Sequence, residues 1–281
     1  MPDDWGEDAT RRAKAALITT TVPNAARVAD YLYGGQSNFE ADRKAARALA
    51  AMAPSITSIP PAVLAFQQRA LHFLVTEAGI TQFIDIGMGL PLVGATHQVA
   101  QSLVPESRVV YVDNDPMVLS HARALLKSAP GGAVGYVDAD PRDTAAIAAG
   151  ARETLDLSRP TAVLLLFTLA YVQDAAEAAA VVSSLAAAMP PGSYVAIYHL
   201  ASDLDPALRE ASREWNKVMP AQPVTPRTRE EVAELAAGLE QVPPGLVPIT
   251  EWRPAPGDPQ FDHVVPLHAV VARKPCAALG D

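Results

Sequence analysis

Two glycines follow an apolar segment in the first third of the sequence. Gln82–Ile86 has the composition of a buried strand, and Gly87 and Gly89 come directly after it, before a helix that we expect to begin at Thr96. Glycine has no Cβ, so the backbone at such a turn approaches a ligand closely. The spacing departs from Gly-x-Gly-x-x-Gly, in which a helix N-terminus receives a pyrophosphate. Alone, the glycine pair is a weak indication of a ligand site.

A second group of polar residues follows the next apolar segment, about 20 residues further on. Asp113 is the first residue after that segment, and its carboxylate is placed to accept hydrogen bonds from ribose hydroxyls. Asn114 follows and belongs to the same candidate site. Asp115 precedes Pro116, which is typical of an N-cap with proline at the first helical position. We therefore assign ligand binding to Asp113 and helix capping to Asp115.

A third acidic turn and a fourth strand end complete the pattern. Asp140 lies in the turn after a third apolar segment, where a carboxylate can accept a hydrogen bond from the exocyclic amine of an adenine. Asp138 is suited to a strand-end cap, and Asp143 is suited to the start of the next helix. Phe167 ends a buried strand and can line the floor of the site near a reacting group. The combination is more specific than any of its parts.

Alternating strands and helices must bring these residues together. Continuous apolar strands separated by helices indicate a parallel sheet that is covered on both faces and joined by right-handed crossovers. The expected strands of this unit are Gln82–Ile86, Arg108–Val112, Val134–Val137, Ala162–Phe167 and Ser193–Tyr198. The helices expected between them are Thr96–Leu103, Pro116–Ser128, Thr144–Leu155 and Ala175–Met189. The candidate residues then lie at the carboxyl ends of adjacent strands, where open α/β sheets bind ligands.

The segments outside this unit complete the predicted organisation. Residues 24–52 read as one or two helices interrupted by the turn 34–38, residues 54–61 as a linker, and residues 62–78 as a helix that ends at Gly79. The predicted last strands, Leu246–Trp252 and Val264–Ala272, form a closing antiparallel hairpin. The expected division is a helical lid over residues 1–61, a Rossmann-like domain over 62–275 with a helical insertion at about 204–240, and a tail over 276–281.

The chemistry of the combined site favours a cationic nucleoside. Two carboxylates and a glycine turn suit an adenosine without phosphate groups, and we expect no Lys or Arg beside them, which argues against NADP. A sulfonium cofactor, S-adenosyl-L-methionine, meets this description. An NAD-dependent oxidoreductase remains an alternative because it uses the same sheet and ribose acid, although the third glycine and a Tyr/Lys pair at helical spacing are missing.

The sequence also resembles a known family. From about Pro23 to Lys274 it is similar to the S-adenosylmethionine-dependent methyltransferases of high-GC bacteria that were long catalogued as a domain of unknown function. The matching stretches are residues 26–32, Gly34-Gly35, Asn38-Phe39, Asp42-Arg43, 82–91, Thr96-His97, 108–116, 158–160, 191–194 and His199. The resemblance implies a class I, Rossmann-like methyltransferase sheet with an N-terminal helical segment over the cofactor. It implies cofactor binding by Asp85, Gly87, Gly89, Asp113 and Asp140.

The sequence departs from that family at several positions. Met88 stands where a threonine is common, Val63-Leu64 where an Asn-Arg pair is expected, and Ala170 where a histidine is expected. These changes make the rim of the pocket more apolar. They motivate a further alternative, an S-adenosylmethionine-binding protein that transfers no methyl group and serves as a sensor or a non-methylating enzyme.

Methyl transfer needs alignment and exclusion of water, and a general base only if the acceptor must lose a proton. His199, at the end of the fifth strand, is our candidate base in preference to His97. Tyr31 is the candidate catalytic residue on the lid. It precedes the double glycine together with Asp30 and Tyr33, and the glycine turn would allow this segment to close over the cofactor. No His/Asp/Glu cluster has the spacing of metal ligands, so no metal is expected.

Composition limits the partners. The formal net charge of −9 with no basic run argues against nucleic acid, and the longest apolar run, residues 162–170, is too short to cross a bilayer. The acidic N-terminus lacks the apolar core of a signal peptide, so we expect a cytoplasmic protein. The expected function is methyl transfer to a small, apolar or aromatic acceptor. The sequence fixes neither the acceptor atom nor the oligomeric state, and a homo-oligomer stays open.

Overall fold

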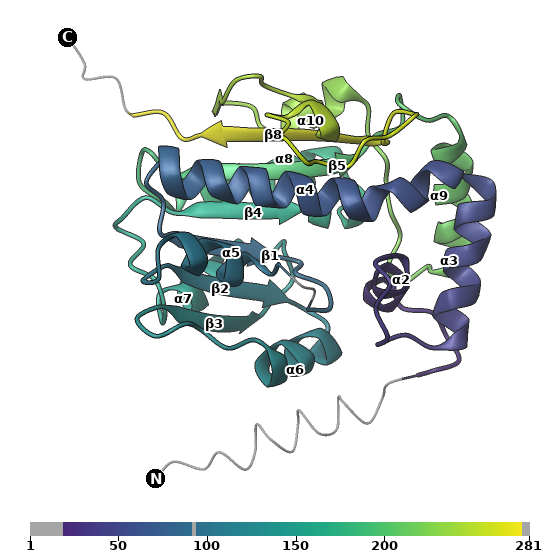
Figure 1. Cartoon of the computed structure of the whole chain (residues 1–281), viewed down its shortest axis with the longest axis horizontal. Coiled ribbons are helices and arrows are strands. Elements are labelled where there is room, and N and C mark those ends of the chain that lie inside the picture. The colour runs from purple at the N-terminus through teal and green to yellow at the C-terminus, as the bar shows by residue number, and fades with distance from the viewer. Residues whose placement is uncertain (1–18, 92–93, 277–281) are drawn as a thin grey trace.

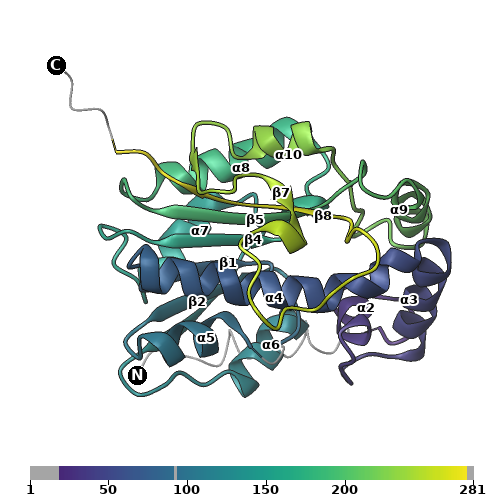
Figure 2. The same ribbon diagram turned by 45° about the horizontal axis from the view of Figure 1, so that its top comes forward.

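The chain folds around one mixed β-sheet with helices on both faces (Figures 1 and 2). The computed structural model describes residues 19–91 and 94–276. Its strands are β1 (Gln82–Ile86), β2 (Arg108–Asp113), β3 (Ala133–Asp138), β4 (Ala162–Leu166), β5 (Tyr194–Leu200), β6 (Glu240–Gln241), β7 (Val247–Pro248) and β8 (Leu267–Arg273). The order across the sheet is β3-β2-β1-β4-β5-β8-β6, and β7 also pairs with β8.

The helices divide between the two faces of the sheet. The described helical segments are α2 (Ala25–Leu32), α3 (Glu40–Met52), η1 (Pro54–Ser58), α4 (Ile59–His72), η2 (Phe73–Glu77), α5 (Thr96–Leu103), α6 (Pro116–Leu125), α7 (Thr144–Ala151), η3 (Thr168–Tyr171), α8 (Ala175–Ala187), α9 (Ala207–Val218), α10 (Arg229–Leu235) and η4 (Ile249–Glu251). One core cluster packs α4, α5 and α6 against the sheet, and a second packs α7, α8 and α10 against the opposite face. Strands β1, β2, β4, β5 and β8 are therefore covered on both sides, as the continuous apolar runs predict.

The predicted Rossmann-like architecture is confirmed. Strands β1 to β5 pair in parallel, and β8 runs antiparallel to β5. The strand order reverses between β1 and β4. The chain runs from β1 to β2 and β3 on one side of β1 and then crosses to the other side of β1 to form β4. Such a switch point opens a crevice at the carboxyl ends of the strands, where ligands bind.

Two local predictions are wrong, and proline explains both. Residues 54–61 are helical rather than a linker: Pro54 opens η1, and Pro60 and Pro61 lie in the first turn of α4. A missing N–H is harmless there because that turn has no intrahelical acceptor for it. The predicted strand Leu246–Trp252 is reduced to β7 and the 3-10 turn η4. Pro248 cannot donate to a sheet ladder, so the strand stops at that residue.

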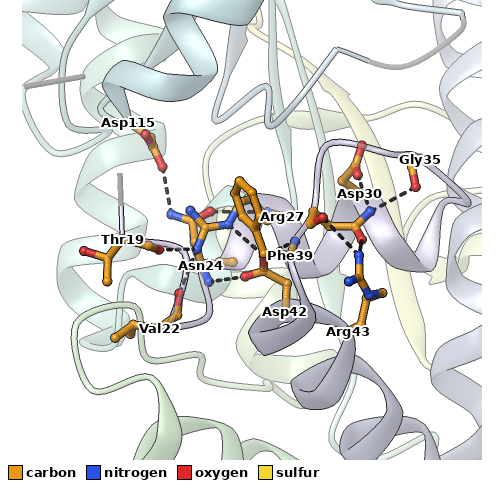
Figure 3. Close-up of polar contacts among 12 residues, drawn as sticks. Thr19, Val22, Asn24, Arg27, Asp30, Gly35, Phe39, Asp42, Arg43 and Asp115 are labelled. Carbon is orange, nitrogen blue, oxygen red and sulfur yellow. Dashed lines mark hydrogen bonds and ion pairs between the residues drawn. The ribbon is translucent and has the colours of Figure 1, made fainter. Parts of the chain in front are cut away.

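Helices α2 and α3 form a separate small cluster beside α9, at the end of the sheet that carries the strand carboxyl ends (Figure 1). A buried ion pair joins them, with Nε of Arg27 2.8 Å from Oδ2 of Asp42 (Figure 3). Asp42 also accepts hydrogen bonds from the N–H groups of Asn24 and Phe39. Because breaking a buried pair leaves an uncompensated charge, this network fixes the angle between the two helices. Residues 1–18 of the predicted lid and 277–281 of the tail lie outside the described residues.

Within residues 19–91 and 94–276 no single helix is long and apolar enough to cross a membrane. A sharply bent pair, Glu40–Met52 with Pro54–Glu77, meets the criteria of length and composition only when its two parts are taken together. The same described residues contain no group of three or more His, Cys, Asp or Glu side chains arranged to hold a metal ion.

Candidate functional site

A cavity of about 650 Å³ opens at the carboxyl ends of β1, β2, β3 and β4 and continues beneath α2. Its size is in the ordinary range for small-molecule sites. One end is polar and contains the turns after the four strands. The other end is apolar and is bounded by α2, α3, η1, the start of α4 and α9. The cavity therefore joins two regions of different chemistry in one space.

The glycine turn after β1 forms part of the polar end. Gly87 and Gly89 have φ of 71° and 63°, values that side chains rarely permit. A Cβ on Gly87 would lie 2.6 Å from Oγ1 of Thr168, whereas a Cβ on Gly89 would meet nothing within 4 Å. Gly87 is thus required by the close approach of Thr168, whose hydroxyl donates to the Ile86 carbonyl. Gly89 is required by its backbone conformation and faces open space.

Asp113 lies beside this turn at the end of β2. Its Oδ2 accepts a hydrogen bond from the Gly89 N–H at 3.2 Å, and its Oδ1 accepts one from the Asp115 N–H at 2.9 Å. A carboxylate offers about four acceptor positions, so each oxygen of Asp113 can accept a further hydrogen bond. Burial raises the pKa of Asp113 to about 6, against the lowering effect of these hydrogen bonds. The sequence-predicted capping role of Asp115 is confirmed by its acceptance of the Met117 N–H.

Asp140 also lines the cavity, but its carboxylate is already occupied. Its oxygens accept from the N–H and the guanidinium of Arg142 and from the side-chain amide of Asn114, at 2.9 to 3.1 Å. The expectation of a site without Lys or Arg is therefore wrong, because Arg142 lines the same end. Binding an exocyclic amine at Asp140 requires one of these donors to leave.

Asp85 is a buried carboxylate on the wall of the same cavity. The Thr96 hydroxyl donates to its Oδ2 at 2.6 Å, and the Gln67 side-chain amide donates to that hydroxyl at 3.1 Å. Burial raises the pKa of Asp85 to about 6, and the hydrogen bond from Thr96 offsets part of that effect. The chain from Gln67 to Asp85 links α4, α5 and β1 around one acidic group.

Phe167 separates the polar end from the apolar end. It follows β4 with φ 74° and ψ −20°, a left-handed conformation that is rare outside glycine. Its N–H donates to the Tyr198 carbonyl at 3.0 Å, and its ring lies 5.7 Å from that of Tyr171 and 6.3 Å from that of Tyr198. Surrounding structure has to hold such a conformation, and strain of this kind gathers at functional sites.

The lid tyrosine predicted from the sequence is the wrong one of two neighbours. Tyr31 does not line the cavity. Tyr33, the residue that directly follows α2, does line it. Side chains two positions apart near the end of a helix point in different directions. The two tyrosines therefore differ in role although they belong to one motif.

His199 is not on the substrate side. On β5 its neighbours Tyr198 and Leu200 face the cavity, so His199 points to the opposite face, where it is fully buried. An Arg227 N–H donates to its Nε2 at 2.8 Å, so its Nδ1–H donates to the Leu200 carbonyl at 3.0 Å. Burial lowers its pKa to about 4. The lone pair on Nε2 already accepts the Arg227 N–H. His199 therefore has no acceptor left for a substrate proton, and we do not assign it the predicted role of general base.

Sequence reasoning missed the partners of these residues. Tyr198 lies in a predicted strand, but only the fold, which brings it into one cavity with Tyr33 across 165 positions of chain, makes it part of the site. Arg142 follows Asp140 by two residues, and this spacing could have revealed the pair. Trp215 lines the apolar end of the cavity, whereas Trp252 is packed in the core against Phe66.

The helical cluster is tied directly to the polar end. The Asn24 side-chain amide donates to Oδ2 of Asp115 at 2.8 Å (Figure 3), and the Ala25 N–H donates to Oε1 of Gln222 at 2.9 Å. Asp115 adjoins Asp113 in one turn. Helix α2 therefore rests on the loop that carries the ribose candidate and on the segment after α9.

Comparison with known proteins agrees with this geometry. Residues 11–275 match a family described as S-adenosyl methyltransferase. A protein of the DUF574 family from Streptomyces avermitilis is 38% identical with a TM-score of 0.86, over 91% of this chain and 99% of that one. A protein from Thermobifida fusca, described as a methyltransferase candidate, is 37% identical with a TM-score of 0.81, over 91% and 96% of the two chains.

A more distant likeness concerns the fold alone. The plantazolicin methyltransferase BpumL, solved with S-adenosylhomocysteine, is 12% identical with a TM-score of 0.51, over 95% of this chain and 98% of that one. No curated protein sequence matches the chain. The family match spans nearly the whole sequence and is supported by two close structural relatives. The chain therefore belongs to the S-adenosyl methyltransferase family, whose cofactor is S-adenosyl-L-methionine.

Proposed function

We propose that the chain transfers the methyl group of S-adenosyl-L-methionine to a small, mainly apolar acceptor. The observation that supports this most strongly is the position of Asp113. Its two oxygens are held by backbone N–H groups of two separate turns and keep acceptor capacity toward a cavity whose far end is apolar. A nucleoside at the first end and an apolar molecule at the second would meet near Phe167.

The residues at the polar end fit the cofactor. We propose that Asp113 accepts the ribose hydroxyls, that the turn of Gly87 and Gly89 provides the close backbone approach, and that Asp85 supplies negative charge near the cationic portion. Asn114 and Asp140 bind the adenine, and a hydrogen bond between Asp140 and Arg142 breaks to make room for it. Acidic groups rather than basic ones suit a positively charged ligand without phosphates.

The chain's own part in the reaction is alignment and exclusion of water. When bound, the cofactor supplies a methyl group activated by the adjacent positive sulfur. Phe167 and Tyr198 shape the passage between the two ends, and the helical cluster of α2 and α3 covers it. Holding two reactants in line in a dry site removes much of the entropic barrier to a bimolecular displacement.

Incubation with S-adenosylmethionine carrying a labelled methyl group tests the proposal on a panel of amines, phenols and thiols. We expect label in one class of acceptor and one S-adenosylhomocysteine for each product molecule. Cofactor binding by calorimetry with no labelled product across the panel would favour the non-transferring alternative. Absence of binding of both the cofactor and S-adenosylhomocysteine would contradict the assignment of the polar end.

The pH dependence of cofactor binding is a further prediction. Burial raises the pKa of Asp85 and of Asp113 to about 6, above the unfolded value of 3.8. The unliganded fold therefore binds more protons than the unfolded chain between these values, and the contribution of both groups to unfolding free energy falls as pH rises through that window. A cationic ligand with hydroxyl donors needs the carboxylates ionised, so its affinity rises over the same window.

We expect the dissociation constant for S-adenosylmethionine to increase about 100-fold between about pH 7.5 and about pH 5, with about tenfold from each of the two carboxylates that must be ionised. Calorimetry at both pH values measures this, with chemical unfolding of the unliganded protein in parallel. Opposite slopes of affinity and stability are the expected signature. An affinity independent of pH would show that neither carboxylate takes part in binding.

A further inference from the structure

Asn24, the residue before α2, lies where the helical cluster of α2 and α3 meets the polar end of the cavity (Figure 3). Its side-chain oxygen accepts the Arg27 N–H at 3.2 Å and so caps α2. Its backbone N–H donates to Oδ1 of Asp42 on α3 at 2.9 Å, and its side-chain amide donates to Oδ2 of Asp115 at 2.8 Å. One residue therefore holds both helices and also reaches the cofactor side.

Asp115 divides its carboxylate between Asn24 and the helix that follows it. Its Oδ1 accepts the Met117 N–H at 2.8 Å and caps α6, whereas its Oδ2 accepts the Asn24 amide. The Asp115 N–H donates to Oδ1 of Asp113, the residue that we propose to bind the ribose, at 2.9 Å. Only Asn114 separates the two acidic residues in the chain. The Asn24 bond and the proposed ribose site therefore share one short turn.

An apolar contact joins α2 to the same end of the cavity. Ala26 packs against a small cluster that includes Leu90 and Met117, and Met88 packs against it too. Met88 and Leu90 belong to the glycine turn after β1, and Met117 begins α6 after the turn of Asp113. Ala26, Met88 and Leu90 all line the cavity. The first turn of α2 therefore rests on both turns that we assign to the cofactor, and a ligand held there lies against the helix as well.

The rest of α2 forms a wall of the apolar end. Val28 and Leu32 line the cavity there, and they belong to the cluster in which Trp215 of α9 is buried. The Ala25 N–H donates to Oε1 of Gln222, in the segment after α9, at 2.9 Å. Helix α2 is only eight residues long, so a shift of its first turn displaces its other end as well. The position of the acceptor wall therefore depends on how α2 is seated on the cofactor turns.

We propose that Asn24 is a positioning residue whose bond to Asp115 couples cofactor binding to the docking of α2, which completes the wall of the acceptor end. Docking here means that α2 rests on the two cofactor turns. A ligand that contacts both the turns and the helix binds the docked arrangement more tightly, and such a difference in affinity is what shifts a conformational equilibrium. The coupling is reciprocal, so docking of α2 also strengthens cofactor binding. This inference rests on the proposed cofactor site.

Hydrogen exchange of the α2 amides tests the coupling, because docking holds the helix in place and slows its local opening. We expect saturating S-adenosylhomocysteine to slow exchange in residues 28–32 of the wild type about tenfold, as one coupled hydrogen bond predicts. Wild-type exchange in this helix that S-adenosylhomocysteine leaves unchanged would overturn the proposal.

Asn24→Ser is the variant for the same measurement. Serine caps helices about as well as asparagine, so the variant keeps the cap of α2, but the shorter side chain does not reach Asp115. With the ligand site of the variant also saturated, the slowing of exchange in residues 28–32 should fall to within about twofold. Slowing equal to that of the wild type would show that the Asn24 bond does not carry the coupling.

A double-mutant cycle on the binding of S-adenosylhomocysteine isolates the bond between Asn24 and Asp115. Asn24→Ser is expected to weaken binding about fivefold to tenfold, which is about what one hydrogen bond contributes. Asp115→Ser keeps the cap of α6 and removes the same bond from the other side. In that background Asn24→Ser should change the dissociation constant by less than about twofold. Fold-changes that simply multiply in the double variant would contradict the assignment.

Asn38→Ser is the matched control. The Asn38 amide donates to Oδ2 of Asp30 at 2.7 Å, a bond of the same kind within the helical cluster, and Asn38 does not line the cavity. The control loosens the cluster without touching the cofactor turns, so ligand affinity and the slowing of exchange in α2 should stay within about twofold of the wild type. Losses as large as those of Asn24→Ser would show that any loosening of the cluster has this effect.

Calorimetry of the wild type with S-adenosylhomocysteine separates this inference from the proposed function. Failure of the wild type to bind the ligand would contradict the cofactor site itself. Binding that slows exchange around residues 113–117 but not in α2 would contradict the coupling alone. Urea unfolding of Asn24→Ser should give a cooperative transition, which shows that the variant is folded.

Discussion

Replacing Asp113 by asparagine is expected to weaken the binding of S-adenosylmethionine about 100-fold. The substitution keeps the size of the side chain and removes its charge, so hydrogen bonds from ribose hydroxyls lose their charged acceptor, each worth about 1.5–3 kcal/mol. It also converts one oxygen, which accepts from the Gly89 or the Asp115 N–H, into an amide donor that repels that N–H. Calorimetric titration of both proteins with the cofactor gives the ratio of dissociation constants.

Asp143→Asn is the matched control for this experiment. Asp143 follows β3 at the same edge of the sheet, caps α7 by accepting the Ala146 N–H, and does not line the cavity. Asparagine caps helices about as well as aspartate, so the control should bind the cofactor normally. Equal affinities of Asp113→Asn and the wild type would mean that the ribose lies elsewhere.

Arg227→Met is expected to lower the free energy of unfolding by about 3–5 kcal/mol. Arg227 is 2% exposed and donates to the carbonyls of Leu169 and Val172 and to Nε2 of His199, at 2.6 to 2.8 Å. Methionine fills much of the same volume but leaves the Val172 carbonyl and Nε2 of His199 without donors, and the Leu169 carbonyl keeps only the Val172 N–H. Since Leu169 lies in η3, directly after Phe167, the loss also loosens the wall between the two ends of the cavity.

Urea unfolding of the unliganded protein measures the effect of Arg227→Met. Arg213→Met is the control: this arginine is 70% exposed and makes an ion pair with Glu210 three residues away on α9. Exposed pairs of this kind contribute little, so the control should change stability by less than about 0.5 kcal/mol. A change of that small size in Arg227→Met would show that water replaces the guanidinium and that the network is not a structural requirement.

The sheet and its polar edge were predictable because they depend on local patterns. Apolar runs of five to seven residues define β1 to β5, and the position of a residue at a strand end follows from the run itself. Gly87, Gly89 and Asp113 come directly after such runs, and they lie together because parallel strands end at one edge. The outer strands were less predictable, since Pro248 shortens β7 within an otherwise strand-like segment.

The chemistry on the acceptor side was not predictable from local patterns. His199 and Tyr198 are adjacent in one strand, and only the alternation of faces together with the position of α2 decides which enters the cavity. A pattern of apolar residues on both faces does not distinguish the two sides. Tyr31 and Tyr33 share a motif, and their different directions depend on where α2 ends. Contacts between segments far apart in sequence determined all of these outcomes.

A crystal structure of the chain with S-adenosylhomocysteine tests the cofactor site most directly. We expect the ribose hydroxyls within hydrogen-bond distance of the Asp113 carboxylate, the backbone of Gly87 and Gly89 against the nucleoside, and the sulfur directed past Phe167 toward Tyr33 and Tyr198. A nucleoside bound outside the cavity, or an Asp113 side chain turned away from the sugar, would contradict the proposed site.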